Sequence, residues 1–570
     1  MKFYSILLSL LFLGLFSASA NAQNYYFCDN GNDNNDGKSQ ASPKKSVSKM
    51  FDTFRGMNGG DSILLCRGGN FEQSSAKKLF NYNCSADKPC TISDYGDENL
   101  SAPVIHYTGT HASLWFSDSQ TFNADGGYNI SNLTLISKQK KGYAIFIADD
   151  VDDFHVDNVH VEGFGIGFHS AGSGPGGNGN RMHDRVTLTN STIINNADQG
   201  FLGGCNDCRL ENNIFENNGY AREIFNHNIY VANGTPTSRF RNMTIRNNTL
   251  YKSTIIDGQC KGVSLVVHGN HDNLIIENNH IKEDKGAVHG HCFGISVDPG
   301  YGSKVDESFR NVVIRGNTLV NMGSIGIGCS SCDGALITNN TIIDENGIMG
   351  RAIVVPSRTE DSVKSKNVSI SNNTIKMVND EIAAVVIEGE NRFKVTGNNI
   401  QVALKSDGTA AECFRRREAN SDTDVSNNSC GTHNGLVIIE EPEVTEPEPE
   451  VTEPEPEVTE PEPEVTEPEP EVTEPEPEVT EPEPEVTEPE PEVTEPEPEV
   501  TEPEPEVTEP EPEVTEPETE VVDNNPPSVD TTVTWRDVMQ SRRNNWGTSP
   551  ETSTDLSNCR VIARGVCFMR

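Results

Sequence analysis

The chain has 570 residues, of which 34% are hydrophobic and 7% aromatic, and its formal net charge is −43. The segment from Glu440 to Glu520 contains 36 glutamates and no lysine or arginine, so the rest of the chain carries only −7. Such a tail argues against one domain filling the whole chain, and against nucleic-acid binding, because no basic patch would outweigh its field. A content of 48 glycines favours many short strands and turns over a helical bundle.

The first 22 residues have the features of a secretory signal peptide. Lys2 gives a positive start, residues 6–16 form an apolar run, and Ala20-Asn21-Ala22 is an A-x-A cleavage site. The run is too short to span ~30 Å of hydrocarbon, and no later segment is more apolar. The sequence therefore predicts a secreted protein, extracellular, periplasmic or on the cell surface, without a membrane span.

Fourteen cysteines fit an exported protein, because disulfides persist in oxidising compartments. Two CxxC pairs are also compatible with a four-cysteine zinc site. Cys205 and Cys329 lie 124 residues apart, however, which makes disulfides the simpler interpretation. The candidate pairs are Cys28 with Cys66, Cys84 with Cys90, Cys205 with Cys208, Cys260 with Cys292, Cys329 with Cys332, Cys413 with Cys430, and Cys559 with Cys567.

A short phrase recurs through the body of the chain: an apolar alternation, then Asn-Asn or a close variant, and often Thr with an aliphatic residue. Successive phrases start 22 to 38 residues apart, a roughly regular period that indicates a solenoid. The ten phrases are residues 130–135, 156–161, 188–193, 210–214, 245–250, 276–281, 314–319, 337–342, 370–375 and 395–400.

The phrases alternate aliphatic and polar residues with a period of two, which is a strand pattern, and helical spacing is absent. Asparagine tolerates left-handed backbone geometry, so Asn-Asn can turn the chain sharply within each coil and stack on its neighbours. The sequence therefore predicts an all-β fold, a parallel β-helix of about ten coils. The usual handedness of parallel crossovers makes it right-handed.

The start of the body resembles the secreted right-handed parallel β-helix proteins of the pectate-lyase-like superfamily, and the resemblance extends over residues 24 to about 430. It rests on the repeats and on Tyr25-Tyr26-Phe27, Gly31-Asn32-Asp33, Asp36-Gly37, Pro43, Gly60-Asp61-Ser62-Ile63 and Arg67-Gly68-Gly69. It implies that residues 23–105 form an N-terminal cap with the first coils and that residues 106–439 form the β-helix body. Members of the superfamily include polysaccharide lyases, uronan epimerases, glycoside hydrolases and proteins with no known activity.

A second strand precedes most of the phrases, and aligning these strands brings polar residues to one outward face. In this alignment His169 falls in the same column as His268 and Asp298, with Tyr230 on the neighbouring coil. The candidate catalytic residues are Tyr230, His268, Asp298 and His169, and the candidate substrate-binding residues are Asn228, His271, Tyr301 and Arg351. The alternative is that these are structural strand and turn residues.

A Tyr–His–carboxylate group suits β-elimination on a uronate-containing glycan, with His as base, Tyr as acid and Asp orienting the His. A glycoside hydrolase is the first alternative, using Asp298 with Asp306, Glu307 or Glu388 as paired carboxylates. A non-catalytic adhesin or glycan-binding module is the second. We expect a polysaccharide partner, a monomer and no cofactor. Calcium remains open, since Asn32-x-Asn34-x-Asp36-Gly37 resembles the front of a calcium loop, although we interpret it as a capping turn.

The unit Glu-Val-Thr-Glu-Pro-Glu-Pro repeats every seven residues between Val444 and Val514. Proline removes helix donors twice per unit, and like charges extend the chain. Residues 440–520 are therefore predicted to be a disordered linker that acts as a spacer. Residues 521–570 carry Trp535, Trp546, Cys559 and Cys567, and form a small C-terminal module that needs its disulfide to be stable.

Overall fold

The computed structural model describes residues 22–117, 125–172, 182–232, 239–300, 307–358, 361–380, 383–388, 392–417 and 423–432, together with the backbone of residues 559–563 and 566–569. The predicted signal peptide, the Glu-Pro linker and most of the C-terminal module lie outside these ranges. The chain divides into two units, residues 1–437 with 529–570 and residues 438–528, and the second contains no described residue.

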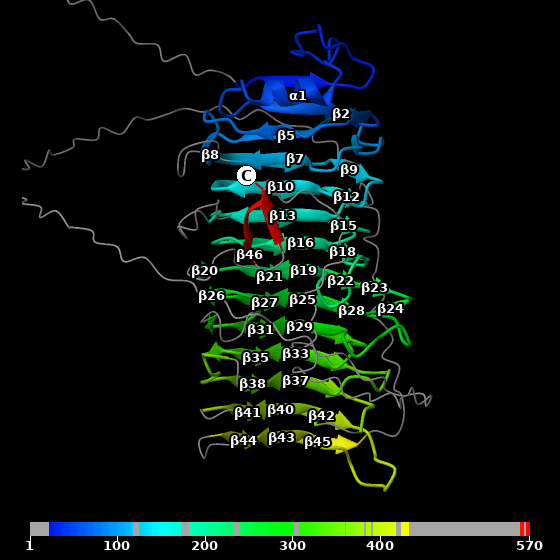
Figure 1. Cartoon of the computed structure of the whole chain (residues 1–570), viewed down its shortest axis with the longest axis vertical. Helices are drawn as coiled ribbons and strands as arrows, with labels where there is room; N and C mark the ends of the chain where they lie inside the picture. The colour runs from blue at the N-terminus through cyan, green and yellow to red at the C-terminus, as the bar shows by residue number, and fades with distance from the viewer. Residues whose placement is uncertain are drawn as a thin grey trace, which may run out of the picture. The chain divides into compact units, whose positions relative to one another are not determined.

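The described body is a parallel β-helix, in which each coil contributes one strand to each of three long sheets (Figure 1). All strand pairs within these three sheets are parallel, as for β8 with β11, β9 with β12 and β10 with β13. The first sheet is made of β1 (Asn24–Phe27), β2 (Ser62–Cys66), β5 (Cys90–Tyr95), β8 (Asp125–Ser131), β11 (Val151–Asp157), β14 (Thr187–Thr189), β17 (Arg209–Glu211), β21 (Thr244–Arg246), β27 (Ile275–Glu277), β31 (Val313–Arg315), β35 (Leu336–Thr338), β38 (Ser369–Ser371), β41 (Lys394–Thr396) and β44 (Asp424–Ser426).

The second sheet follows the first in every coil, after a short turn. It is made of β3 (Asn70–Gln73), β6 (Val104–Tyr107), β9 (Thr134–Ser137), β12 (His160–Glu162), β15 (Thr192–Ile194), β18 (Ile214–Glu216), β22 (Thr249–Tyr251), β28 (His280–Lys282), β32 (Thr318–Val320), β36 (Thr341–Ile343), β39 (Thr374–Lys376), β42 (Asn399–Val402) and β45 (Ser429–Thr432).

The third sheet completes each coil and carries the candidate site. It is made of β4 (Lys78–Leu79), β7 (Ala112–Ser117), β10 (Tyr143–Asp149), β13 (Ile166–Gly172), β16 (Gln199–Gly203), β19 (His227–Val231), β25 (Val263–Val267), β29 (Phe293–Val297), β33 (Ile325–Cys329), β37 (Arg351–Val355), β40 (Val385–Glu388) and β43 (Phe414–Arg417).

Three smaller groups of strands complete the described structure. A four-stranded parallel sheet lies between the third and first sheets and contains β20 (Arg239–Arg241), β26 (Asn270–Asp272), β30 (Phe309–Arg310) and β34 (Cys332–Asp333). The pair β23 (Ile255–Ile256) and β24 (Gln259–Cys260) is antiparallel. A separate antiparallel hairpin, β46 (Cys559–Ala563) with β47 (Val566–Met569), places Ile562 opposite Cys567. The side chains of Cys559 and Cys567 are outside the described residues, so their disulfide stays a prediction.

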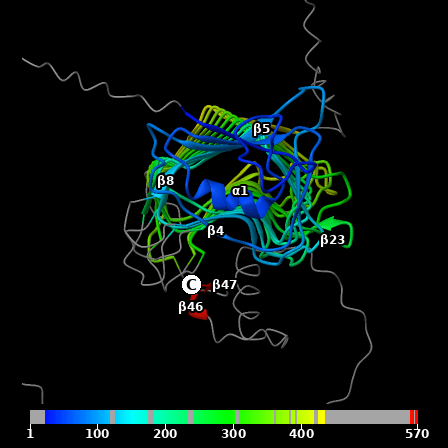
Figure 2. The same cartoon turned by 90° about the horizontal axis from the view of Figure 1, so that it is seen from above.

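The helix is right-handed, as expected. Figure 2 looks down the axis from the N-terminal end, and the chain passes clockwise from the first sheet (β5, β8) to the second and then to the third (β4) while it recedes from the viewer. The short helix α1 (Val47–Phe54) lies across the end of the stack, where it caps the core (Figure 2). Its buried face consists of Val47, Met50, Phe51 and Phe54.

The interior is filled by the aliphatic and phenylalanine side chains that alternate inward along each strand. In the third sheet, Ile229, Leu265, Ile295 and Ile353 belong to one continuous buried cluster, as the alternation predicts. Burial of each such side chain contributes ~1.5–3 kcal/mol. The ten phrases account for ten coils, one coil for each phrase. The described sheets contain further coils, because β2 with β3 and β5 with β6 precede the first phrase, and β44 with β45 follow the last.

The two corner positions of the phrases from residue 210 onward have different roles, whereas each of the first three phrases has a single asparagine, followed by Leu133, Val159 or Ser191. The first adopts a positive φ, 54° at Asn278 and 55° at Asn339, and Gly316 and Gly397 replace it in two coils. The second is buried and joins a ladder along the axis. The main-chain N and Nδ2 of Asn317 both donate to Oδ1 of Asn340, at 3.0 and 2.9 Å, and Nδ2 of Asn340 donates to Oδ1 of Asn373 at 3.0 Å. From Asn213 to Asn428 the ladder satisfies buried polar groups at this corner of each coil.

Six disulfides join the cysteines of the described body in the predicted pairs: Cys28–Cys66, Cys84–Cys90, Cys205–Cys208, Cys260–Cys292, Cys329–Cys332 and Cys413–Cys430. Because both CxxC pairs are oxidised, the alternative of a four-cysteine zinc site is wrong. Within the described ranges, no helix is long and apolar enough to cross a membrane.

Candidate functional site

The outward face of the third sheet carries one residue per coil in direct register. This set, called the outer column here, contains Trp115, Phe146, His169, Leu202, Tyr230, Val266, Ser296, Gly328, Val354 and Val386. Lys78 precedes this set and Arg415 follows it; between them, aromatic rings occupy the positions from Trp115 to Tyr230 except Leu202, and small or aliphatic side chains occupy those from Val266 to Val386. Tyr230 is the last aromatic residue before this change.

Tyr230 lies on β19, half-buried, between two histidine rings. Its ring packs edge-on against His268, with centroids 5.5 Å apart and an interplanar angle of 87°, and against His227 at 5.2 Å and 83°. His268 follows the last residue of β25, so it is two positions beyond the outer-column residue Val266. The parallel stacking of β19 and β25 thus brings Tyr230 and His268 together although 37 residues separate them.

His268 is only 3% exposed and is held by the next coil. Its Nδ1 lies 2.6 Å from the main-chain oxygen of Asp298 and 3.7 Å from Oδ1 of the same residue. Since a carbonyl oxygen can only accept, Nδ1 must carry the proton and donate it. In the neutral imidazole the lone pair is therefore on Nε2, which is the atom able to act as a base.

Asp298 is fully buried, and its carboxylate is bound on both oxygens. Ser296 Oγ donates to Oδ1 at 2.8 Å, and Arg358 Nη1 donates to Oδ2 at 3.2 Å. Arg358 also binds Asp361 through Nη2 at 2.6 Å, so one buried guanidinium lies between two buried carboxylates. This buried ion cluster (Asp298, Arg358 and Asp361) fixes Asp298 and, through it, His268.

Sequence reasoning did not find Arg358 or Asp361. Both belong to the chain that follows β37, and Arg358 reaches back across two coils to Asp298. Arg358 Nη2 also donates to the main-chain oxygen of Pro299 at 3.3 Å, and Ser330 Oγ donates to Asp361 at 2.6 Å. The Arg–x–x–Asp spacing, which lets the guanidinium contact Asp361 locally, was the available signal, but it did not indicate which coil the cluster would contact.

The placement of His169 in the column of His268 and Asp298 is wrong. The strand register puts His169 opposite Leu202, and Leu202 opposite Tyr230, so His169 shares its column with Tyr230, two coils away. His169 is 5% exposed, and its ring stacks on Phe146 at 5.2 Å and 29°. Burial lowers its pKa to about 3. It belongs to an aromatic group and not to the Tyr230–His268 contact.

Two of the four predicted substrate-binding residues are internal. Asn228 is fully buried in a second, shorter row of asparagines with Asn196 and Asn218, where its Oδ1 accepts from Asn218 Nδ2 at 2.9 Å and its Nδ2 donates to Tyr251 O at 3.1 Å. His271 is stacked between Phe240 and Phe309 in the four-stranded sheet, and burial lowers its pKa to about 4. Side chains packed in this way cannot contact a substrate on the outer face.

Arg351 is the first residue of β37 and pairs with Ile325. It therefore lies at the opposite end of the strands from His268, and four coils beyond Tyr230. At about 4.8 Å per coil it is roughly 19 Å along the axis from Tyr230. The structure does not bring it to the Tyr230–His268 contact. Tyr301 and Asp306 are outside the described residues.

Two of the carboxylates named as hydrolase partners of Asp298, Glu307 and Glu388, accept hydrogen bonds from main-chain N–H groups. Glu307 is buried, and its Oε2 accepts from the main-chain N of Gly269 at 3.1 Å and of Gly300 at 2.8 Å. It therefore caps the turn beside His268, while the Asp298 carboxylate points to Arg358. Glu388 accepts from Ser357 N at 3.4 Å. A half-exposed carboxyl that sequence reasoning missed is Asp198, before β16, whose pKa is raised by burial.

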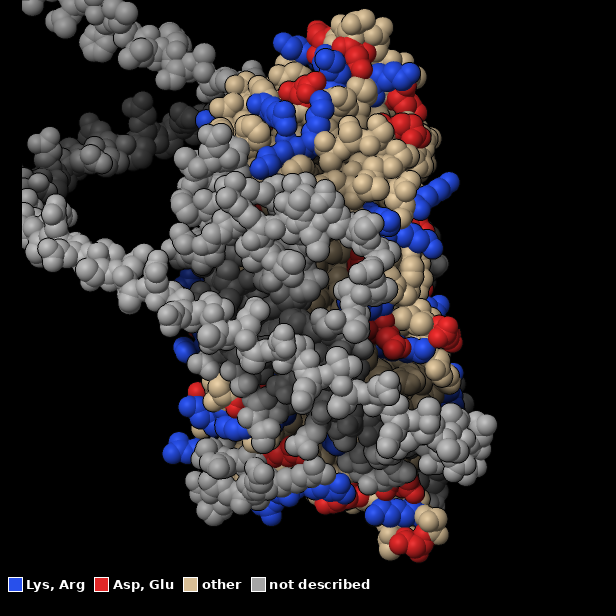
Figure 3. Space-filling view, in the orientation of Figure 1, with Lys and Arg blue, Asp and Glu red and all other residues tan. Residues whose placement is uncertain are grey.

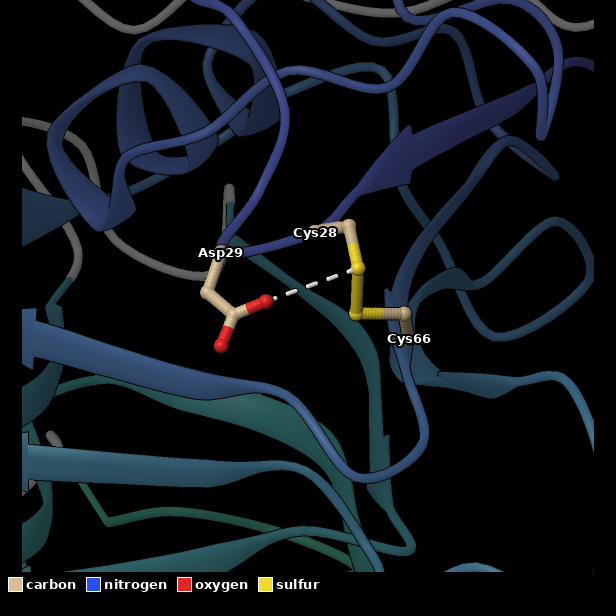
Figure 4. Close-up of side chains that lie close together, drawn as sticks. All are labelled: Cys28, Asp29 and Cys66. Atoms are coloured by element: carbon tan, nitrogen blue, oxygen red, sulfur yellow. Dashed lines mark hydrogen bonds between the residues drawn. A yellow bond between two sulfur atoms is a disulfide. The ribbon is translucent and has the colours of Figure 1, made fainter.

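Two groups of three potential metal ligands are close enough among the described residues, and each contains both halves of a disulfide. Figure 4 shows the first, in which the Asp29 carboxylate points toward the Cys28–Cys66 bond with Oδ1 3.7 Å from Cys28 Sγ. A bonded sulfur is not a thiolate ligand. In the calcium-like loop, Asp33 Oδ1 accepts from the main-chain N of Lys45 and Ser46 at 3.0 and 2.8 Å, which is the bonding of a capping turn.

The fold and its strand pairing define the chain as a right-handed parallel β-helix protein. Residues 417–558, which contain the whole Glu-Pro repeat, match the model of the herpesvirus envelope glycoprotein GP350 C-terminal family. A lacto-N-biosidase of Bifidobacterium longum subsp. longum is 34% identical over 102 residues, 18% of this chain and 6% of that protein. The chain thus spans a small fraction of the length of the curated relative it matches.

Among solved structures, the catalytic unit of a GH87 alpha-1,3-glucanase from Streptomyces thermodiastaticus is similar, with a TM-score of 0.43 and 13% identity over 68% of this chain and 65% of that one. The A-module of the mannuronan C-5 epimerase AlgE6 of Azotobacter vinelandii has a TM-score of 0.43 and 18% identity, over 67% of this chain and 94% of that one. The fold assignment rests on the strand register of this chain.

Proposed function

We propose that this chain is a polysaccharide-active enzyme, a lyase that cleaves a uronate-containing glycan by β-elimination on the outward face of the third sheet. The observation that carries the proposal is the continuous contact of Tyr230, His268 and Asp298, which come from three successive coils. Titratable groups that meet in this way on an otherwise structural scaffold are candidates for acid–base chemistry.

In β-elimination a base removes the proton from C5, beside the uronate carboxylate. The bond from C4 to the glycosidic oxygen breaks, a C4=C5 double bond forms, and an acid protonates the departing oxygen. His268 is suited to be the base, because its Nδ1–H is bound to Asp298 and Nε2 carries the lone pair. Tyr230 is suited to be the acid, since it is the more exposed of the two.

The buried ion cluster supplies the support that this chemistry needs. When His268 takes a proton, its imidazolium lies beside the Asp298 carboxylate, which Arg358 and Ser296 hold in a single orientation. A fixed carboxylate behind a histidine sets its tautomer and stabilises its charged form. Asp298 is therefore a positioning residue, as its complete burial requires.

A direct test is incubation of the purified protein with alginate, pectate and neutral glycans. A lyase produces new ultraviolet absorbance from the double bond conjugated to the carboxylate. The Tyr230→Phe variant, which removes the proposed acid, should lose this signal, while Tyr251→Phe on the second sheet should keep it. Absence of unsaturated product from every uronate-containing glycan would contradict the lyase proposal.

A glycoside hydrolase is the second candidate. It is favoured by Asp198, a half-exposed carboxyl with a raised pKa, whose charge also affects the pKa of Tyr143 and Tyr220. Burial that raises the pKa of a carboxyl favours its protonated form, which is the form that acts as a general acid. The matched relative that is named a lacto-N-biosidase agrees with this candidate. New reducing ends without ultraviolet absorbance, lost in Asp198→Asn, would support it over the lyase.

The remaining features fit an exported protein. Six disulfides in the described body are expected only where the surroundings are oxidising. We therefore propose secretion, with residues 440–520 as an extended spacer between the β-helix and the C-terminal module. Recovery of the mature chain starting at Gln23 from the medium or periplasm of an expressing bacterium would support this, and retention of Met1 would contradict it.

A further inference from the structure

Five aromatic rings from three neighbouring coils of the third sheet contact one another on the outward face. They form the aromatic platform, made of His111, Trp115, Tyr143, Phe146 and His169. Trp115, Phe146 and His169 are in direct register on β7, β10 and β13. Ring centroids are 4.4 Å apart for His111 and Trp115, 6.3 Å for Trp115 and Phe146, 4.6 Å for Tyr143 and Phe146, and 5.2 Å for Phe146 and His169.

The platform is separate from the core of the helix. The residues that alternate with it, such as Leu114, Ile145 and Phe168, belong to the internal cluster, whereas none of the five rings does. His111, Trp115, Tyr143 and Phe146 are all partly exposed. A cluster of large rings that faces outward is unusual on a soluble protein, and such clusters mark surfaces that bind a ligand.

Three ring nitrogens of the platform have no hydrogen-bond partner among the described residues: His111 Nδ1, Trp115 Nε1 and His169 Nδ1. All three atoms are buried, and His169 as a whole is 95% buried. A buried polar atom without a partner costs ~1–3 kcal/mol. A ligand rich in hydroxyl groups would supply those partners, while its apolar ring faces would pack on the aromatic rings.

One lysine contacts the platform, and three more lie on the turn before Tyr143, although the chain as a whole is acidic. Lys78 is paired in register with Trp115, and its Nζ lies 5.5 Å from the centroid of the indole. Lys138, Lys140 and Lys141 are exposed on the turn that leads into Tyr143. No described carboxylate forms an ion pair with these four lysines. Figure 3 shows blue side chains, with red ones among them, on the front of the coils nearest α1.

We propose that the aromatic platform is a binding subsite for a carboxylated glycan, with sugar rings stacked on Trp115 and Phe146 and a uronate carboxylate bound by Lys78. The assignment of the ligand as a carboxylated glycan rests on the proposed function. The existence of a binding site rests on the aromatic platform alone. The subsite lies toward the N-terminal cap from Tyr230, separated from it by the coil of Leu202, a distance of roughly 10 Å between His169 and Tyr230. One glycan chain can therefore reach both.

The test uses the emission of Trp115 in the full chain. The chain has three tryptophans, so the Trp535→Phe, Trp546→Phe double variant leaves Trp115 as the only one. Oligogalacturonate and oligomannuronate are titrated, with methyl-esterified oligogalacturonate as the uncharged match. We expect a saturable change in Trp115 emission with at least one of the acidic oligosaccharides. The ester should bind at least tenfold more weakly, and binding of the acidic oligosaccharide should weaken as the salt concentration is raised.

Two variants locate the contacts. Trp115→Leu should weaken calorimetric binding of the acidic oligosaccharide at least tenfold, and Lys78→Gln should weaken it while leaving binding of the ester unchanged. Tyr82→Leu, which removes a half-exposed ring outside the platform, should change neither. Unchanged melting temperatures show that each variant folds. No emission change with either acidic oligosaccharide, or equal binding of acid and ester, would overturn the proposal.

The same titration separates this inference from the proposed function. In a Tyr230→Phe background the glycan is not consumed, so binding at Trp115 is measured alone. Binding at Trp115 without turnover of any glycan would support the subsite and contradict the lyase proposal. The opposite result is turnover of a glycan while the Trp115 emission does not change and Trp115→Leu does not affect KM. It would contradict the subsite and support the lyase proposal.

Discussion

The ring of Tyr230 on β19 is perpendicular to the imidazole of His268 at the end of β25, with centroids 5.5 Å apart. Parallel stacking of β19 on β25 creates this contact, because adjacent coils are about 4.8 Å apart. Removing either side chain should therefore act on chemistry and leave the core intact.

Tyr230→Phe and His268→Gln should each lower kcat on the glycan that the enzyme cleaves by 10²–10⁴-fold, the usual range for loss of a general acid or base. The melting temperature of Tyr230→Phe should stay within a few degrees of the parent. Tyr251→Phe, which changes a half-buried tyrosine on the second sheet, is the matched control. Full activity in both active-face variants would show that the contact is structural.

Arg358→Met should destabilise the protein strongly, because Asp298 and Asp361 would be left buried without their counter-charge. Breaking a buried ion pair by removal of one partner costs about 3–5 kcal/mol. Arg415→Met, which breaks the more exposed pair with Glu412, should cost less than ~1 kcal/mol. Urea unfolding of the two variants measures the difference, and equal losses would mean that the cluster does not depend on Arg358.

The stability of the protein should fall on mild acidification partly because of His271. Its folded pKa of about 4 lies below the ordinary value of 6.5, so between these values the unfolded chain binds the proton and the folded chain does not. The contribution is complete above pH 6.5 and is lost as the pH falls toward 4. The loss is on the order of 3 kcal/mol.

His271→Phe keeps a ring between Phe240 and Phe309 and removes the titrating group. The melting temperature of this variant should fall less between pH 7 and pH 4.5 than that of the parent. Glu283, whose pKa is raised by burial, has the opposite sign and is present in both proteins, so the comparison isolates His271. Parallel pH curves for the two proteins would contradict the assignment.

Asn340→Ala should interrupt the asparagine ladder and remove the Asn340 partner of the main-chain N of Asn317 and of the carbonyl of Ile314, while Nδ2 of Asn317 keeps its bond to Ile276 O. Each unsatisfied buried group costs ~1–3 kcal/mol. Asn339→Gly is the matched control, because Asn339 has a φ of 55° and glycine already occupies the equivalent position at Gly316. We expect a loss of several degrees in melting temperature for Asn340→Ala and almost none for the control.

Removal of residues 440–570 should leave kcat/KM on a soluble glycan unchanged, since the described contacts of Tyr230, His268 and Asp298 all lie within residues 227–361. If the linker acts as a spacer, the truncated protein should turn over an insoluble or surface-bound glycan at a different rate from the full chain. A fall in turnover of the soluble glycan would show that the tail takes part in the reaction.

The sequence by itself determined the coil. The period-two alternation chose inward residues such as Ile229 and Leu265, and the Asn-Asn pairs marked the corners. Closely spaced cysteines indicated four of the six disulfides, and the even number of cysteines left the two longer pairs, Cys28–Cys66 and Cys260–Cys292. These are local properties, repeated in every coil. Only the tertiary structure decided the site, because turns of different length shift neighbouring strands by whole residues. The strand register placed His169 beside Phe146, a second row of asparagines buried Asn228, and the segment after β37 brought Arg358 across two coils to Asp298.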